Sequence, residues 1–307
     1  MNFQPDSSNF RVARPARAWQ RWWIASRPRT LAMALTPVVA GACLAWSDDA
    51  PVRPVVFVLT LACALLIQAA TNLLNDVADH EKGNDGRDRV GPLRITAAGW
   101  ATPREVRRAA ALAFGAALAC GVPLVWSGGL PILAFGLGSS IAGWAYSAGA
   151  RPVSYRATGE LFVLVFFGVV AVSGTYYLQA HTWSPAAFAT GAAIGAIAAA
   201  VLLVNNYRDL APDAAAGRRT LVNVLGPARS RTLYAVLMLA PLALPPALAL
   251  ASPARPGAWL ACLAAPLLLQ SIGAMRRLYG PDLNAVLGRT ALAQLLYGAL
   301  LSIGVLI

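Results

Sequence analysis

Four polar side chains around residue 75 have the types and the spacing of a cation site. Residues 72–79 read Asn-Leu-Leu-Asn-Asp-Val-Ala-Asp, and a helix places Asn72, Asn75, Asp76 and Asp79 within an arc of about 100°. Carboxylates this close repel each other, so a cation should compensate them. Mg²⁺ prefers carboxylate and amide oxygens and often completes its shell with substrate phosphates. The cluster therefore predicts a magnesium–diphosphate site.

A second cluster repeats this pattern 133 positions later. Asn205 and Asp209 keep the four-residue step of Asn72 and Asp76, and a further Asp and a Gly follow in both places. Two acidic clusters facing each other across a cavity would hold one or two Mg²⁺ ions with a diphosphate on the metals. The remaining charge would be neutralised by three nearby cations, which are Arg208, Arg218 and Arg219.

Two loops next to these clusters carry cations and aromatic residues. Gly83 should end the first helix, and the residues from Lys82 to Arg94 are interpreted as a lid that meets the diphosphate. The loop from Tyr146 to Glu160 could line a mouth for an aromatic anion. Ordinary alternatives remain open for both: an acidic loop neutralised by its own arginines, and a charged surface loop.

The elements that position these residues are apolar helices. The chain is 58% hydrophobic and 12% charged, and most of its apolar runs are about 17–22 residues long, the length that a helix needs to cross a bilayer. Inside lipid a helix satisfies its own backbone groups. We predict an all-α, polytopic membrane protein with about nine transmembrane helices around a central cavity, arranged as two four-helix halves plus a ninth helix. The expected spans are 31–46, 54–75, 106–126, 130–146, 159–179, 185–206, 233–251, 257–275 and 286–307.

The charge distribution predicts an orientation. The net charge is +12, and 23 of the 25 Lys and Arg fall in segments on one side if the spans alternate; only Arg53 and Arg255 fall on the other. This is the positive-inside pattern of membrane proteins, and it argues against nucleic-acid binding. We expect a multi-pass protein of the bacterial cytoplasmic (inner) membrane, with the N-terminus and the active site in the cytoplasm and the C-terminus outside. Residues 1–21 are interpreted as a mobile basic tail near the anionic leaflet, and residues 22–307 as one transmembrane domain.

Several motifs together resemble one known family, the UbiA-type membrane prenyltransferases. They cover nearly the whole chain after its first twenty residues: Arg27-Pro-Arg-Thr-Leu, the stretch from Asn72 through Gly91-Pro-Leu-Arg94, the loop from Tyr146 to Glu160 with Phe166-Phe-Gly168, and the stretch from Asn205 through Gly217-Arg-Arg-Thr-Leu221. The Gly-Pro-Leu-Arg ending is most similar to the branch that prenylates 1,4-dihydroxy-2-naphthoate in menaquinone synthesis. Arg218 departs from the Lys that many relatives carry, which changes a point charge into a fork.

The resemblance implies a Mg²⁺-dependent transfer of a polyprenyl group from polyprenyl diphosphate to 1,4-dihydroxy-2-naphthoate, with loss of CO₂ and diphosphate, giving demethylmenaquinone. The implied metal ligands are Asn72, Asp76, Asp79, Asp209 and Asp213, and the four Asp are the expected catalytic residues. The implied diphosphate-binding residues are Lys82, Arg89, Arg94, Arg208 and Arg218. The implied substrate-binding residues are Asn75, Asn205, Tyr146, Arg151 and Tyr155.

Two other functions fit the same residues. The first is a UbiA-type enzyme with another aromatic acceptor, such as 4-hydroxybenzoate, or with a phytyl donor. The second, from a different class, is a polytopic cation-coupled transporter whose acidic residues at membrane depth bind cations. Product analysis separates them, because only the enzyme releases diphosphate and CO₂.

Overall fold

Helices make up every regular element in the described part of the chain, which is residues 17–83, 91, 93–148, 152–252 and 255–307 of a computed structural model. The α-helices are α1 (Ala18–Ser26), α2 (Pro28–Ser47), α3 (Pro54–Glu81), α4 (Pro103–Ser147), α5 (Gly159–Leu164), α6 (Ala171–Ala180), α7 (Pro185–Arg208), α8 (Leu210–Ala215), α9 (Leu221–Leu239), α10 (Leu244–Ala251), α11 (Ala265–Arg277) and α12 (Leu283–Gly304). A π-helical segment, η2 (Val165–Val170), joins α5 to α6, and the 3₁₀ segments are η1 (Val153–Tyr155), η3 (Ala240–Ala243), η4 (Pro256–Ala264) and η5 (Gly280–Asp282). The predicted mobile tail lies mostly outside the described residues, and its last residues enter α1.

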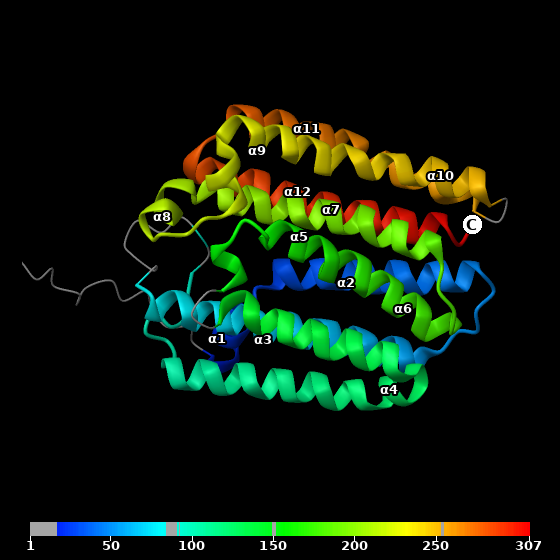
Figure 1. Cartoon of the computed structure of the whole chain (residues 1–307), viewed down its shortest axis with the longest axis horizontal. Coiled ribbons are helices and arrows are strands. Elements are labelled where there is room, and N and C mark those ends of the chain that lie inside the picture. Colours follow the sequence, from blue (N-terminus) through cyan, green and yellow to red (C-terminus); the bar gives the residue numbers. More distant parts are fainter. Residues whose placement is uncertain (1–16, 84–90, 92, 149–151, 253–254) are drawn as a thin grey trace, which may run out of the picture.

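Eight helical stretches of the described chain are long and apolar enough to cross a membrane. The longest, α4, holds 45 residues, and its geometry breaks at Gly129, where φ is 68° and ψ is −155°. Val106 near its start packs with Val77, and Gly143 near its end lies against Thr71, so both ends of α4 meet the same end of α3. The chain therefore reverses at Gly129 (Figure 1). Counted as two limbs, α4 raises the total to nine crossing segments in the described residues, which confirms the predicted multi-pass helical fold.

Helix α3 extends beyond its predicted span. It runs 28 residues from Pro54 to Glu81, or about 42 Å at 1.5 Å per residue, which exceeds a hydrocarbon core of about 30 Å. Pro54 suits the first turn because its missing N–H has no helical partner there. Gly83, at φ 71°, follows the end of the helix, as predicted. The residues from Asn72 to Asp79 thus occupy the final turns of a rigid helix.

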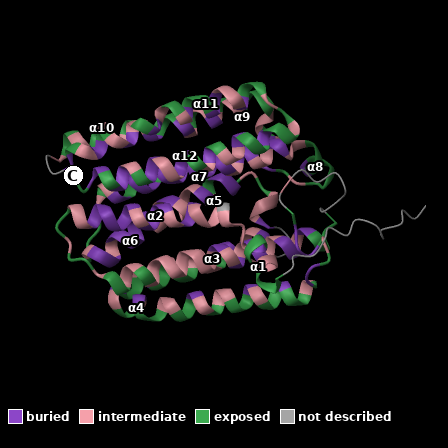
Figure 2. Ribbon diagram, turned by 180° about the vertical axis from the view of Figure 1, so that it is seen from behind, coloured by how far each residue is buried: buried purple, intermediate pink, exposed green. Residues whose placement is uncertain are grey.

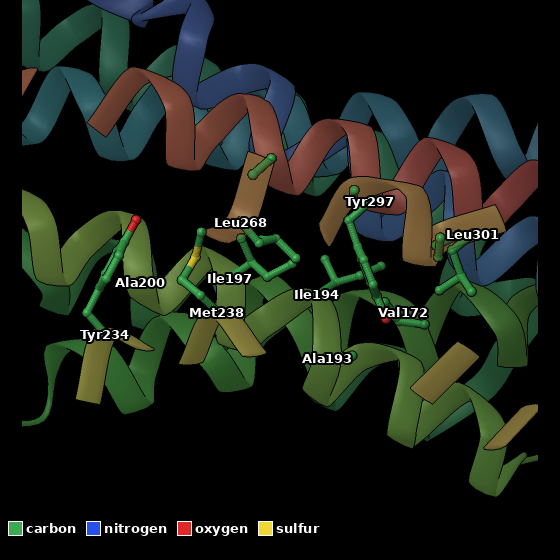
Figure 3. Close-up of a cluster of buried hydrophobic side chains, with 14 of the residues drawn as sticks. Val172, Ala193, Ile194, Ile197, Ala200, Tyr234, Met238, Leu268, Tyr297 and Leu301 are labelled. Carbon is green, nitrogen blue, oxygen red and sulfur yellow. The ribbon is translucent and has the colours of Figure 1, made fainter. Parts of the chain in front are cut away.

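The core lies around α7, which packs against α2, α9, α12 and the α5–η2–α6 span. Buried colouring concentrates on the central helices in Figure 2, whereas α4 on the outside is largely exposed or intermediate. Figure 3 shows side chains of α7, α9, α11 and α12 pointing toward one another, among them Ile194, Ile197, Met238 and Leu268. Two buried tyrosines satisfy their hydroxyls here: Tyr234 bonds with Thr290 at 2.7 Å, and Tyr297 donates to the Pro241 carbonyl at 2.8 Å.

Small residues let α7 approach the fifth span, which consists of α5, η2 and α6, closely. A Cβ added at Gly168 in η2 would lie 2.2 Å from the Gly191 carbonyl oxygen and 2.6 Å from the Gly195 Cα. Gly191 and Gly195 form a Gly-x-x-x-Gly motif, which favours close helix contact in membranes because lipid-buried helices associate through packing. This contact fixes η2 and the end of α5 against the first half of α7.

Arg53 and Arg255, the two cations predicted to lie opposite the basic side, are at the end of the bundle that holds Gly129. The buried Arg255 pairs with Asp48 and donates to the Ser47 Oγ at 3.2 Å, while Arg53 contacts the ring of His181. The other arginines and the lysine of the described residues lie toward the opposite end, where α1, α8 and the ends of α3 and α7 meet (Figure 1). That end also holds both acidic clusters.

Candidate functional site

A cavity of about 1220 Å³ runs through the bundle and is lined by α2, α3, α4, the α5–η2–α6 span, α7 and α12. At one end its wall is polar, with the side chains of Asn72, Asn75, Asn205, Arg208 and Asn284. Farther along, the wall is almost entirely apolar. It includes four phenylalanine rings from α4, α5 and η2, which are Phe135, Phe162, Phe166 and Phe167. A cavity of this kind suits an amphiphile with a polar head and a long apolar tail.

Arginines join the two acidic clusters, whose aspartates are not among the residues that line the cavity. Arg218 donates from one guanidinium nitrogen to the Asp79 Oδ1 at 2.5 Å and from the other to the Asp213 Oδ1 at 3.2 Å. Arg94 pairs with the second carboxylate oxygen of Asp79. Asp79, Asp213 and Arg94 are buried, so salt in the solvent screens these ion pairs only weakly. The structure thus places Asp79 and Asp213, 134 positions apart, on one guanidinium.

Arg208 organises the second cluster. Its guanidinium donates to both carboxylate oxygens of Asp209, at 2.8 and 2.6 Å, to the Asn205 Oδ1 at 3.0 Å and to the Asn284 Oδ1 at 2.7 Å. A fork with this many partners is held in one orientation. Because Arg208, Asn205 and Asn284 also line the cavity, this network forms part of its polar end.

Two of the predicted ligands have other partners. Asp76 is buried, and its carboxylate accepts hydrogen bonds from the backbone N–H groups of Ile95 and Thr96, both at 3.0 Å, and from the Thr96 hydroxyl. Asn72 lines the cavity, but its amide donates to the Ser26 carbonyl at 2.8 Å and to the Thr30 hydroxyl at 2.9 Å. The predicted arc is present on α3, yet the loop after residue 94 folds back and engages Asp76.

Arg218 links two of the acidic residues, but no three acids converge within the part of the chain that the structure describes. Within the described residues no group of three or more His, Cys, Asp or Glu side chains could hold a metal ion as they stand. The guanidinium of Arg218 lies between Asp79 and Asp213 and supplies the compensating charge. Burial raises the pKa of the Asp213 carboxyl to about 6; Arg218 opposes this shift, and the charges of Asp209 and Asp79 add to it. Carboxylate and amide oxygens are the donor set that Mg²⁺ takes. These residues therefore fit that ion if the arginines release the carboxylates.

Aromatic and cationic side chains surround this cluster. The Tyr155 ring has the Lys82 Nζ at 4.3 Å from its centroid and the Arg218 guanidinium carbon at 4.6 Å, which are cation–π distances. Tyr146 lines the cavity itself. Arg89 and Arg151, predicted for diphosphate and substrate, lie outside the described residues.

Three residues that form hydrogen bonds in or next to this site were not proposed as site residues from the sequence. Thr96 and Asn284 act through partners far away along the chain, so no local pattern marks them. Glu160, which accepts from the Asn206 amide at 2.9 Å, had a signal: it is an acid at the start of an otherwise apolar span. An ionisable residue at such a depth indicates function.

Comparison with known proteins places these features in a wider group. Residues 34–300 match the UbiA prenyltransferase family. The chain is 37% identical to 1,4-dihydroxy-2-naphthoate octaprenyltransferase of Escherichia coli (strain K12), over 93% of this chain and 95% of that relative. It is 38% identical to the protein of the same name from Mycobacterium tuberculosis, over 91% and 94% of the two chains. Its fold resembles that of a UbiA homolog from Archaeoglobus fulgidus bound to GPP and Mg²⁺, with a TM-score of 0.65, 18% identity, and coverage of 93% of this chain and 99% of that one.

Proposed function

Because the chain belongs to the UbiA prenyltransferase family and is an enzyme that transfers prenyl groups, we propose that it transfers a polyprenyl group from polyprenyl diphosphate to 1,4-dihydroxy-2-naphthoate. The products are CO₂, diphosphate and demethylmenaquinone. The observation that carries this proposal is the identity of 37–38% over more than nine-tenths of the chain to relatives named for that acceptor. The cavity supports it, since a polar end that includes Arg27 and Arg208 continues into an apolar channel suited to a prenyl tail.

Mg²⁺ is the proposed cofactor, held by Asp79, Asp209 and Asp213. The amide oxygens of Asn75 and Asn205, which were predicted to bind substrate, are proposed to complete this ligand set. A solved UbiA homolog binds this ion together with a prenyl diphosphate, and the donor set here is of the same hard-oxygen kind. When bound, the ion supplies positive charge that stabilises the leaving diphosphate. Asp76 and Asn72, predicted as ligands, are proposed instead to hold neighbouring segments in place. Asp76 accepts from the backbone of Ile95 and Thr96, and Asn72 donates to the end of α1 and to Thr30 in α2.

The cations of the site are proposed to bind the diphosphate. Arg218 and Arg208 now neutralise Asp79, Asp213 and Asp209, and they can turn toward phosphate oxygens when those carboxylates take a metal. Preorganised charge of this kind usually contributes the largest part of catalysis. Lys82 and Arg94 from the first loop complete the set in this proposal, with Arg89, which lies outside the described residues.

The remaining residues are proposed to serve the acceptor and the reactive carbon. Tyr146 and Tyr155, with Arg151 outside the described residues, would bind the ring and its carboxylate near the mouth. The apolar wall excludes water, which would otherwise quench an allylic cation. We further propose that residues 22–307 act as one domain of the bacterial inner membrane, with the site on the cytoplasmic side.

Purified protein in lipid vesicles tests the function. We expect CO₂, diphosphate and a prenylated quinol when it receives dihydroxynaphthoate, a prenyl diphosphate and Mg²⁺. Mass spectrometry of the products from a mixture of acceptors, including 4-hydroxybenzoate, fixes the acceptor. Predominant prenylation of another acceptor would overturn the naphthoate assignment, and cation uptake without any product would favour a transporter.

Substitution of the proposed ligands tests the site. Asp79→Asn and Asp209→Asn should each lower kcat by about 10²–10³-fold, the usual effect of removing one electrostatic contact to a transition state. Elution volume in detergent should match that of the unmodified protein. Near-normal turnover in either variant would exclude a metal held between the two clusters.

A further inference from the structure

A second cavity, the outer groove, lies on the surface of the bundle between α9 and α11. It has a volume of about 670 Å³ and includes Arg276 of α11. The rest of its lining is one face of α9, with members three or four residues apart, among them Ala228, Arg231, Thr232, Ala235, Val236 and Leu239. The two helices lie side by side at the edge of the bundle, away from α3 (Figures 1 and 2). Among the described residues, the outer groove and the central cavity share none.

The outer groove has a cationic end and an apolar remainder. Arg231 follows closely after the break in α9 at Gly226, and Arg276 is next to the last residue of α11, so both belong to the basic end of the bundle. Both stretches are apolar enough to span a membrane. From Arg231 to Leu239 the helix rises about 12 Å at 1.5 Å per residue. Half of a hydrocarbon core is about 15 Å thick, so the apolar part of the groove fits within one leaflet.

Two tyrosine rings hold Arg231 in place. Its guanidinium carbon is 4.7 Å from the centroid of the Tyr279 ring and 5.5 Å from that of the Tyr207 ring. Tyr207 is buried at the end of α7, whereas Tyr279 is 61% exposed, as is common for tyrosine at a membrane–water interface. Among the described residues, neither Arg231 nor Arg276 forms an ion pair with an acid. The groove therefore carries positive charge that the described part of the protein does not pair.

A phospholipid with a negative headgroup matches both parts of the outer groove. We propose that the groove binds one anionic phospholipid of the surrounding bilayer. Its phosphate lies on Arg231 and Arg276, and one acyl chain lies along Ala235, Val236 and Leu239. Guanidinium groups bind phosphate oxygens through paired hydrogen bonds. Lipid phosphates are found at the membrane interface, the depth of these arginines, and the acyl chain fills the leaflet beneath.

The charge of the groove selects this occupant over two others. A zwitterionic lipid carries an ammonium group, which the two arginines repel. A second copy related by a twofold axis would present the same patch, and the charged lining residues, Arg231 and Arg276, are both cations. Such a patch is not complementary to itself, as a twofold contact requires. Val236 and Leu239 are 55% and 42% exposed, so they offer apolar surface to an acyl chain.

Titration with phosphatidylglycerol tests the site. Full-length protein in a neutral detergent receives increasing amounts of this lipid, and native mass spectrometry quantifies the one-to-one complex. Each basic residue near a lipid phosphate contributes about 1 kcal/mol, so Arg276→Gln should raise the apparent Kd about fivefold. Arg231→Gln combined with Arg276→Gln should raise it about 30-fold. Phosphatidylethanolamine, which is zwitterionic, should bind the unmodified protein more weakly than phosphatidylglycerol does.

Arg229 and Arg277 provide the matched control. Each is an exposed arginine close to a groove arginine on the same helix, and neither is among the described lining residues. Arg229→Gln combined with Arg277→Gln removes the same charge from the same end, and the Kd should stay within about twofold. Ala235→Leu fills the groove without changing its charge and should weaken binding. If Arg231→Gln does not fold, the exposed Arg276 carries the test through Arg276→Gln alone.

Four results would overturn the proposal. Equal weakening in the groove variants and in the matched control would mean diffuse attraction to the basic end. Equal affinity for phosphatidylethanolamine and phosphatidylglycerol would mean that the arginines do not select the headgroup. Displacement of the lipid by an equal concentration of inorganic phosphate would mean that the apolar part contributes nothing. A dimer that the groove variants break, with lipid binding unchanged, would assign the groove to a second copy of the chain.

Discussion

Asp76 and Asp79 lie one helical turn apart on α3 and have different surroundings. Asp76 bonds the backbone of Ile95 and Thr96, whereas Asp79 bonds the side chains of Arg94 and Arg218. The two roles are linked: by holding residues 95 and 96, Asp76 fixes the preceding Arg94 over Asp79. One acid therefore orders the loop that brings a cation to the other.

Removing the anchor at Asp76 should loosen that loop. In Asp76→Asn the amide replaces one accepting oxygen with a donor and leaves buried N–H or hydroxyl groups unsatisfied, which costs about 1–3 kcal/mol. We expect a raised KM for the diphosphate and faster tryptic cleavage after Arg94, measured by mass spectrometry of the fragments. Asp49→Asn, an exposed acid at the other end of the bundle, is the control. Unchanged cleavage after Arg94 would contradict the anchoring role.

The pKa of Asp213 gives the site a pH dependence. Burial raises this pKa to about 6, so the carboxyl carries a proton more often as the pH falls through that value. A metal ligand must be ionised, and protons therefore compete with Mg²⁺. We expect the Mg²⁺ concentration for half-maximal activity to rise about tenfold per pH unit below pH 6. In Asp213→Asn that dependence should disappear. A half-maximal concentration that is flat across this pH range would be inconsistent with Asp213 as a ligand.

At the scale of elements, the contact between α7 and the fifth span sets the shape of the cavity. The backbone of α7 at Gly191 and Gly195 touches η2 and the end of α5 with no side chain between them. The π-helical turn of η2 lies at this contact, and such turns often mark functional sites. A change of one methyl group at the contact therefore has to move a whole span.

Gly195→Ala tests this contact. Its Cβ would lie 2.4 Å from the Leu164 carbonyl oxygen, a backbone atom that cannot turn away. We expect a loss of about 1–3 kcal/mol of stability from overpacking, seen as a lower thermal midpoint in detergent. Gly115→Ala in α4 has open space around its Cβ and should show no loss. Equal midpoints for the two variants would show that the span can shift without cost.

The sequence predicts those features of the fold and the site that neighbouring residues determine, and not the contacts between distant segments. The spans follow from runs of apolar residues, and Gly83 marks the end of α3, so both could be predicted from neighbouring residues. The pairing of the two acidic clusters could be predicted from their repeated spacing. The partners of Asp76 and the link from Asp79 through Arg218 to Asp213 depend on loops that return from distant positions, which periodicity does not describe.

At the scale of the whole molecule, charge and length point to one arrangement in the bilayer. Most of the arginines and acids gather at one end of the bundle, and α3 is long enough to carry Asp79 past the hydrocarbon core. The apolar part of the cavity then lies at the depth of the lipid tails. A prenyl chain can stay in that layer while its diphosphate remains at the polar surface.

The orientation is testable with fusions at the C-terminus. With the basic end in the cytoplasm, an odd number of crossings should place Ile307 outside the cell. Alkaline phosphatase fused there should be active, and a fused green fluorescent protein exported in unfolded form should stay dark. A fusion after Arg219 in the basic end should give the reverse pattern. Fluorescence from the C-terminal fusion would contradict the orientation.

The reversal of α4 at Gly129 also bears on how the protein is made. Ser127, Gly128 and Gly129 are uncharged, and the turn needs no longer connection because glycine adopts the positive φ found there. The two limbs can therefore enter the lipid together as a hairpin while the ribosome is still synthesising the chain, without moving a charged loop across. A Lys or Arg at the centre of an inserting helix costs about 2.5–3.5 kcal/mol. The three residues that form the turn between the two limbs of α4 thus also favour insertion of the chain into the membrane.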